Sequence, residues 1–303
     1  MNSAERTFRS LHFGLYSTYM ERTKGLSNFH THCNLDDGTG VMEEYVLSAL
    51  SKGFSALGFS CHTPGKLQDG WHMRTEDFPG YLEEIARLRS LYKDRIEIYA
   101  GLELDYLEDT REMVGYEYRD QVDYTIGSVH MMRHAKSDRY LAVDGPIEEY
   151  ELLLEDNFQG DIQRFVGYYF EIQERMIAQY RFDLLGHCDL MKKRNKGNRF
   201  FDPKEPWYRK HASHLLKTAR KHKVRIEVNT GGMARGATDE VYPSFEMIEE
   251  CALLGIPLTL SSDAHQSTHL DFYFSQADDQ LVQAGHRTLD VLQHGMWQSV
   301  PIV

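Results

Sequence analysis

The strongest constraint on the fold is a regular alternation of two kinds of segment from residue 26 onward. Runs rich in β-branched, aromatic and aliphatic residues, typical of strands, occur at 26–32, 55–62, 96–106, 122–130, 182–190, 224–232 and 256–265. Segments with helical spacing of apolar residues lie between them, at 41–53, 79–94, 147–158, 164–180, 206–223 and 244–255. This pattern predicts parallel βα units. With no linker or repeat, it favours one closed or nearly closed α/β barrel of seven strands over a doubly wound sheet.

The alternation divides the chain into two parts. Residues 1–25 stand outside it and are expected to be an N-terminal extension of unknown role, whereas residues 26–303 form the barrel domain. The sequence indicates where two helices of the barrel domain begin. Pro206 suits a first helical position, and Ser244 can cap the helix that follows Pro243.

Composition narrows the class of protein. No stretch of eighteen apolar residues occurs and no signal peptide is recognisable, which predicts a soluble cytoplasmic protein without a membrane partner. The four cysteines show no paired spacing, so we expect them to be reduced. The net charge of -12 disfavours a nucleic-acid partner, because such binding needs clustered Lys and Arg.

Side chains that can bind metal ions stand at the ends of six of the seven strand candidates. They are His30, His32, His62, Glu103, His130, His187, Asp263 and His265. The remaining candidate ends in Asn229. In parallel α/β folds the C-terminal ends of the strands converge, and ligand and catalytic groups gather there. Residues two apart on a strand share a face, so each same-strand pair can present two ligands to one site.

The side chains at the strand ends are stronger evidence for a metal site together than any one of them is alone. A single strand-end histidine is more often a satisfied or solvated side chain than a ligand, but six of the 15 histidines fall at strand ends. The adjacent Cys33, Cys61 and Cys188 alternate to the opposite face, where they read as buried apolar side chains. Nitrogen and carboxylate ligands without thiolate suit Zn, Mn or Fe. Because the candidates exceed what one ion can use, the sequence predicts two or three ions.

Such a cluster suits hydrolysis of a phosphate ester, in which a metal-bridging hydroxide attacks phosphorus in line. It would suit amide hydrolysis nearly as well. Two stretches favour phosphate: 229–236, with Asn229, glycines and Arg235, and the cationic run of Lys192, Lys193 and Arg194. Trp71 lies in a long polar loop, 62–80, that is a candidate lid. The glycines could equally make only a turn, the cations a solvated surface, and Trp71 an anchor for its loop.

Four sequence blocks, taken together, resemble the polymerase and histidinol phosphatase (PHP) superfamily. They are "FHTHCNLDDG", "GFSCHTPG", "GLELDY" with "IGSVH", and "GHCDL" with "SSDAH". The stretch "WHMRTEDFPGYLEEI" is similar to the branch of histidinol-phosphate phosphatases of the PHP type. The resemblance runs from about residue 26 to about residue 290. It implies a distorted (β/α)7 TIM-like barrel with a trinuclear metal site at the C-terminal ends of the strands.

The resemblance also implies a distribution of ligands over three ions. One ion would take His30, His32, Glu103 and Asp263. Glu103 would bridge to a second ion held by His130 and His187. The third would take Asp37, His62 and His265, while Asp36, Gly38 and Gly40 shape the loop. Glu103, Asp263 and His265 are the candidate catalytic residues, and Arg235, Lys192, Lys193, Asn229 and Trp71 the candidate substrate-binding ones.

The reaction implied is hydrolysis of L-histidinol phosphate, a small-molecule partner, to L-histidinol and phosphate in histidine biosynthesis. Three alternatives remain: a PHP phosphoesterase for another small phosphate or nucleotide, an amidohydrolase-like enzyme, and a non-catalytic metal-binding protein. The amidohydrolase reading is weakened because Glu103 stands where a modified lysine is common. The N-terminal extension departs from the family pattern and leaves homo-oligomerisation open.

Overall fold

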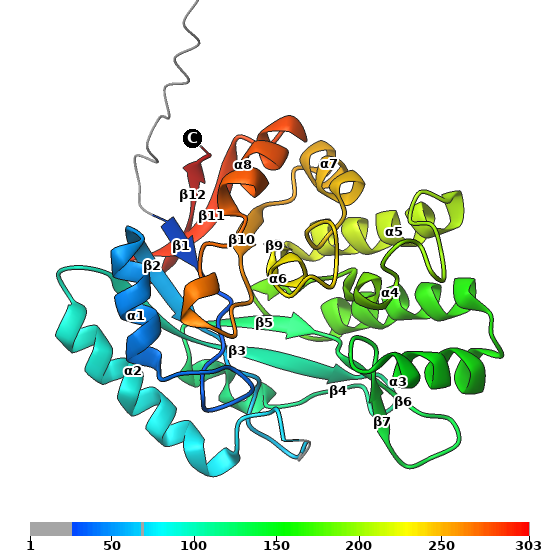
Figure 1. Cartoon of the computed structure of the whole chain (residues 1–303), viewed down its shortest axis with the longest axis horizontal. Helices are drawn as coiled ribbons and strands as arrows, with labels where there is room; N and C mark the ends of the chain where they lie inside the picture. Colours follow the sequence, from blue (N-terminus) through cyan, green and yellow to red (C-terminus); the bar gives the residue numbers. More distant parts are fainter. Residues whose placement is uncertain (1–25, 68–69, 303) are drawn as a thin grey trace, which may run out of the picture.

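Seven parallel strands form a nearly closed barrel in the computed structural model, which describes residues 26–67 and 70–302 (Figure 1). The predicted extension, 1–25, lies outside the described residues. In spatial order the strands are β1 (Leu26–Asn28), β2 (Phe54–Phe59), β3 (Glu97–Leu107), β5 (Tyr124–Ser128), β8 (Leu184–Leu185), β9 (Arg225–Asn229) and β10 (Leu258–Ser261). All six neighbouring pairs are parallel. The α/β barrel predicted from the alternation is confirmed.

The first and last strands of the barrel meet just beyond their C-terminal ends. Thr31 and Ala264 form a parallel bridge. The amide of His32 donates to the carbonyl of Ala264 (2.9 Å), and the amide of Ala264 donates to the carbonyl of His30 (3.2 Å). The barrel therefore closes at the level of the predicted ligands rather than along the strands.

Helices surround the barrel on its outside (Figure 1). They are α1 (Met42–Ser51), α2 (Phe78–Tyr92), α3 (Ile147–Leu152), α4 (Ile162–Gln179), α5 (Pro206–His222), α7 (Phe245–Leu254) and α8 (Phe274–Gln283), whereas the short α6 (Gly231–Ala234) follows β9 at the C-terminal end of the barrel, beside Asp263. Neither α6 nor α8 belongs to the predicted helical segments, and α3 continues into a π-helical turn, Leu153–Asn157. Single 3₁₀ turns occupy Thr75–Asp77, Tyr116–Gln121, Leu190–Arg194 and Ser267–His269. Within the described ranges, no helix has the length and apolar character needed to cross a bilayer.

The two predicted helix starts have different outcomes. Pro206 is the first residue of α5, as predicted. Ser244 occupies the position before α7, but its side chain makes no capping hydrogen bond, so the predicted cap is wrong in that respect. Its backbone amide instead donates to Asp189 Oδ2 (2.9 Å). The buried carboxylate of Asp189 thus accepts the hydrogen bond that solvent would otherwise accept from this amide.

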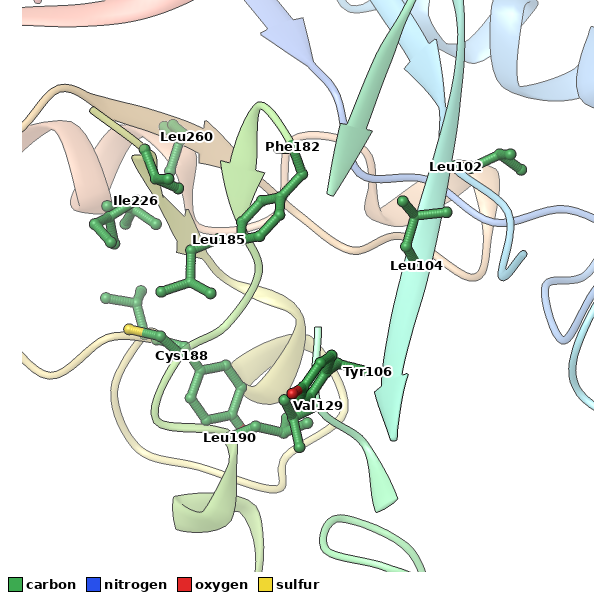
Figure 2. Close-up of a cluster of buried hydrophobic side chains, with 14 of the residues drawn as sticks. Leu102, Leu104, Tyr106, Val129, Phe182, Leu185, Cys188, Leu190, Ile226 and Leu260 are labelled. Carbon is green, nitrogen blue, oxygen red and sulfur yellow. The ribbon is translucent and has the colours of Figure 1, made fainter. Parts of the chain in front are cut away.

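Alternation along β3 separates the core from the barrel interior. Leu102, Leu104 and Tyr106 are fully buried in the core between the sheet and the helices, and Figure 2 shows them together with Leu185 of β8 and Ile226 of β9. The residues between them, Glu103 and Asp105, point the other way, because successive side chains alternate across a strand. The same alternation brings polar side chains of β5, β9 and β10 to the inside.

Aromatic side chains fill the N-terminal end of the barrel. The ring of Tyr124 occupies the space in which Cβ atoms on Gly58 and Gly101 would lie 2.3 Å from it, so these two positions accept only glycine. The hairpin of β11 (Thr288–Gln293) and β12 (Met296–Pro301), which the sequence pattern did not predict, covers this end. Its Trp297 packs edge-on against Phe29, with ring centroids 5.4 Å apart. Within the described residues, the barrel interior is thus filled at this end.

Candidate metal centre

The predicted metal-binding side chains lie together at the C-terminal end of the barrel. Groups with ligand atoms close enough to share an ion are His32, Asp37, His62 and His265; His30, Glu103 and His187; and His30, His32 and Asp263. His130 lies beside them, with its Nε2 atom 3.2 Å from that of His187. All but Asp37 and His265 are buried. The structure therefore brings together side chains from the ends of six strands.

Glu103 stands at the middle of this cluster, with its two oxygens facing different histidines. Oε2 lies 3.2 Å from His30 Nε2 and 3.2 Å from His62 Nδ1. Oε1 lies 3.0 Å from His187 Nε2 and 3.4 Å from His130 Nε2. Ser128 orients the carboxylate by donating its hydroxyl to Oε1 (2.6 Å). A carboxylate in this position can bridge two ions.

Two aspartates complete the cluster on the side of β1 and β10. Asp263 Oδ1 lies 3.3 Å from His32 Nε2 and 3.4 Å from His265 Nδ1. Asp37 Oδ1 lies 3.1 Å from His265 Nε2 and 3.8 Å from His62 Nε2. Asp263 has a φ of 49°, a left-handed conformation that costs free energy for a non-glycine residue. Such backbone strain is typical of functional sites.

The donor set fits divalent metal ions. Four buried atoms that face one another make no hydrogen bond of normal geometry within the described chain: His30 Nε2, His32 Nε2, His62 Nδ1 and Glu103 Oε2. A buried polar atom without a partner costs about 1–3 kcal/mol, so a cluster of them is unfavourable unless something else binds there. Imidazole nitrogens and carboxylate oxygens are ligands for Zn, Mn and Fe.

A second layer of carboxylates fixes three of the imidazole rings. His30 Nδ1 donates to Glu227 (2.6 Å), His32 Nδ1 to Asp36 (2.6 Å) and His130 Nδ1 to Asp105 (2.8 Å). Each bond leaves the Nε2 atom free to face the cluster, the arrangement usual around metal-binding histidines.

Sequence reasoning missed this second layer. It assigned Asp36 only to loop shape and gave no role to Asp105 or Glu227. A signal was available, because Asp105 lies two residues from Glu103, and Glu227 two residues from Asn229, on the same strand faces.

Attraction between the histidines and the carboxylates shifts their pKa values in the metal-free cluster. Burial opposes ionisation of Glu103, but His30 and His130 hold its pKa well below the ordinary value. Burial also disfavours the charged form of His130, yet Asp105 and Glu103 raise its pKa to about 10. For His62 burial dominates and lowers the pKa to about 4. In the absence of metal, protonated histidines therefore balance part of the negative charge.

A cavity of about 1010 Å³ opens over the cluster, and three of the predicted substrate-binding residues line it. Arg235 donates to Asp263 Oδ2 (2.8 Å) and lies 3.1 Å from His265 Nδ1. Trp71 packs edge-on against His62, with centroids 4.6 Å apart. Lys193 also lines the cavity. Residues 68–69 of the candidate lid lie outside the described residues.

The other two predicted substrate-binding residues do not reach the cavity. Lys192 is buried, with its ammonium 2.8 Å from both Asp189 Oδ2 and Glu240 Oε1. Consecutive residues of the 3₁₀ turn Leu190–Arg194 point in different directions, so only one of the two lysines can face the cavity. Asn229 is fully buried and bonds to Glu227 and to the amide of Gly231. Asn229 thereby holds Glu227 of the second layer, and its predicted contact with a substrate stays a prediction.

One wall of the cavity was not predicted at all. The hairpin of β6 (Met131–Arg133) and β7 (Tyr140–Ala142), with the turn that leads to α3, contributes Tyr140, Asp144 and Glu149. These residues lie well beyond the end of β5, in the connection that leads to α3, so the rule that strand ends carry the site could not find them.

Comparisons with known proteins agree with this geometry. The model of the family described as PHP domain matches residues 27–231. A Deinococcus radiodurans protein named as a probable histidinol-phosphatase is 31% identical over 278 residues, covering 88% of this chain and 96% of its own.

Two solved structures share the fold. That of a Listeria monocytogenes protein assigned as a histidinol phosphatase has a TM-score of 0.72 at 22% identity, covering 83% of this chain and 99% of the other. A Lactococcus lactis histidinol phosphate phosphatase, solved with zinc, L-histidinol and phosphate, has a TM-score of 0.61 at 17% identity, covering 90% and 98%.

Proposed function

The chain belongs to the PHP domain family, and from that membership we propose that it is a metal-dependent phosphomonoesterase that hydrolyses L-histidinol phosphate to L-histidinol and phosphate. The observation that carries the proposal is the position of Glu103, whose two oxygens face two pairs of imidazole nitrogens at the floor of the cavity; in one pair, His30 Nε2 and His62 Nδ1 have no hydrogen-bond partner within the described chain. A closed structural site would not leave such ligands open to a cavity of this size.

Nine side chains would hold two or three Zn, Mn or Fe ions. His30, His32, Glu103 and Asp263 would bind one ion. Glu103 would reach a second with His130 and His187. Asp37, His62 and His265 would bind the third. The distances between the side chains support this division, since each proposed set has its atoms within 4.8 Å or joined through Glu103.

The protein's own residues would position the reacting groups. Divalent ions, when bound, supply a water nucleophile at neutral pH and neutralise charge that develops on the phosphoryl oxygens. Glu103, Asp263 and His265 lie nearest to the reacting atoms in this arrangement. Arg235, held by the carboxylate and backbone carbonyl of Asp263, would donate to a phosphoryl oxygen. Trp71 would exclude water from the His62 side.

The choice of substrate rests on the relatives. The Deinococcus protein, which aligns with 88% of this chain, carries a name for this activity, and the Lactococcus enzyme was solved with its product and phosphate. A second candidate is another PHP phosphoesterase, for a different small phosphate or a nucleotide. It would keep the cluster and differ only in the cavity wall, so the substrate has to be measured.

We also propose a cytoplasmic location. The four cysteines are free and buried, which suits a reducing compartment. Sizing by light scattering would show whether the full chain is a homo-oligomer.

The test is phosphate release by the purified full chain loaded in turn with Zn, Mn and Fe. We expect kcat/KM for L-histidinol phosphate to exceed that for a panel of sugar phosphates, nucleotides and phosphodiesters by at least about tenfold, and chelation to abolish turnover. Preference for another ester would favour the second candidate. Metal binding without hydrolysis of any ester would support a non-catalytic role.

A further inference from the structure

The cavity carries two carboxylates that the metal centre does not use. Five acidic residues line it, of which Asp37, Glu103 and Asp263 belong to the proposed ligand sets. Asp144 and Glu149 remain, and both lie on the wall between β7 and α3. Arg139, Lys193 and Arg194 also line the cavity, so its charge is mixed, yet two further carboxylates beside a site for phosphate dianions are unfavourable unless a cation faces them, because like charges repel.

Asp144 is held firmly in this wall. Its Oδ2 atom accepts from Lys193 Nζ (2.6 Å), and its backbone carbonyl accepts from Arg194 Nη2 (2.6 Å). Within the described chain its other oxygen, Oδ1, has no hydrogen-bond partner. The side chain is 18% exposed, toward the cavity that it lines. One oxygen is thus fixed by the protein and the other is available to a ligand.

Glu149, which lies within α3, repeats this arrangement. Its Oε2 atom accepts from the amide of Ala142 (2.7 Å), and Oε1 is left without a partner in the described residues. The turn between the two acids ends at α3, so backbone bonds on both sides fix their spacing. The wall therefore presents two anchored carboxylates, each with an unused acceptor.

Asp144 also lies close to the metal centre. It lines the same cavity as His130 and Arg235, on the wall that also carries Lys193. Asp144 thus presents a carboxylate to the cavity that holds the proposed ligands.

We propose that Asp144, assisted by Glu149, is the subsite that recognises a primary ammonium group on the substrate. The inference deepens the proposed function and rests on it: in L-histidinol phosphate the ammonium is borne by the carbon next to the phosphorylated one. Arg235 and the metal ions would take the phosphate, and the unused oxygens of Asp144 and Glu149 would accept from the ammonium. A phosphate ester without a cation would leave these two oxygens without a partner and close to a dianion, so the wall selects against it.

The test compares two substrates that differ only in the amine. L-histidinol phosphate carries it, and imidazolylpropyl phosphate does not. For Asp144→Asn we expect kcat/KM on L-histidinol phosphate to fall about 10- to 100-fold, because a charge-assisted hydrogen bond is lost. Activity on the amine-free ester should be unchanged or higher. Glu149→Gln should change the ratio in the same direction by a smaller factor.

Glu148→Gln is the matched control, since Glu148 is exposed and does not line the cavity. An equal loss on both esters in Asp144→Asn would mean that Asp144 only holds Lys193, and would overturn the proposal. Calorimetric measurement of binding tests the subsite even if neither ester is hydrolysed. Failure to hydrolyse either ester would count against the proposed function alone. Wild-type protein should bind L-histidinol more tightly than imidazolylpropanol, and Asp144→Asn should remove this preference. Equal binding of both alcohols by the wild-type protein would also overturn the subsite.

Discussion

At the residue scale, Glu103 links all parts of the candidate centre. A glutamine there would keep the shape and the bond from Ser128, but it would lose the charge and turn one acceptor oxygen into a donor group. We expect Glu103→Gln to abolish turnover and to reduce the bound metal by at least one ion per chain, with circular dichroism unchanged. Elemental analysis and kcat measurements check this.

Glu108 provides the control for that substitution. It is also buried, follows the same strand, and accepts from the amide of Arg133 rather than from a histidine. Glu108→Gln should retain activity and metal content. Near wild-type turnover in Glu103→Gln would contradict the assignment of the cluster.

Glu227 tests the second layer without removing a proposed ligand. It accepts from His30 Nδ1 (2.6 Å) and, through its other oxygen, from the amide of His187 (3.0 Å). Glu227→Gln keeps an acceptor but weakens the hold on both rings, so we expect metal affinity to fall about 10- to 100-fold. Competition with a chromophoric chelator measures the affinity. An unchanged affinity would show that ring orientation does not depend on this carboxylate.

At the element scale, the short helix α6 delivers Arg235 to the centre. A Cβ atom on Gly231 would lie 2.9 Å from Arg235 Nη2, 2.9 Å from the carbonyl of Ser262 and 3.0 Å from Asp263 Cβ. Gly231→Ala should therefore displace the guanidinium or Asp263 and lower kcat/KM by about tenfold or more, since small misplacements are costly in catalysis.

The matched control is Gly80→Ala on the exposed surface of α2, where an added Cβ meets nothing within 4 Å. There the substitution should leave activity unchanged and raise stability by about 0.5–1 kcal/mol, because alanine favours the helix. Thermal melts and steady-state kinetics of both variants check the pair. Full activity in Gly231→Ala would mean that α6 can shift without loss.

The elements differ in how far the sequence could predict them. The seven barrel strands are marked by apolar runs, and their polar ends follow from parallel topology, so the centre could be located without a structure. By contrast, β6 and β7 pair only with each other, across a turn outside the barrel. A local hairpin of this kind does not contribute to the alternation of barrel strands and helices in the sequence, so the wall with Asp144 could not be predicted from it. The separation of Lys192 from Lys193 depends on the rotation of one 3₁₀ turn, which spacing does not reveal.

At the scale of the whole molecule, the stability of the metal-free protein depends on the protonation of the histidines and carboxylates in the centre. Burial opposes the charged forms of His30, His32 and His130, but neighbouring carboxylates raise all three pKa values, that of His130 to about 10. A histidine with a raised pKa contributes stability that is complete below its unfolded value of about 6.5 and is lost as the pH rises through the folded value. The acid side is opposite in sign: Glu103 and Asp105, whose pKa values are lowered despite burial, contribute above about pH 4 and lose this contribution as the pH falls.

Bound metal ions replace these protons, so metal and pH should act together on stability. We expect chelation to lower the Tm by about 5–10 °C at pH 7 and by more at pH 10, because the metal-free form then loses its imidazolium charges while the loaded form does not. Scanning calorimetry of loaded and chelated protein at the two pH values measures the difference. In Glu103→Gln, the Tm should change less on chelation than in the wild-type protein, at both pH values. A Tm difference that shrinks between pH 7 and pH 10 would mean that the protonated histidines do not stand in for the ions, and would contradict the arrangement of charges around Glu103.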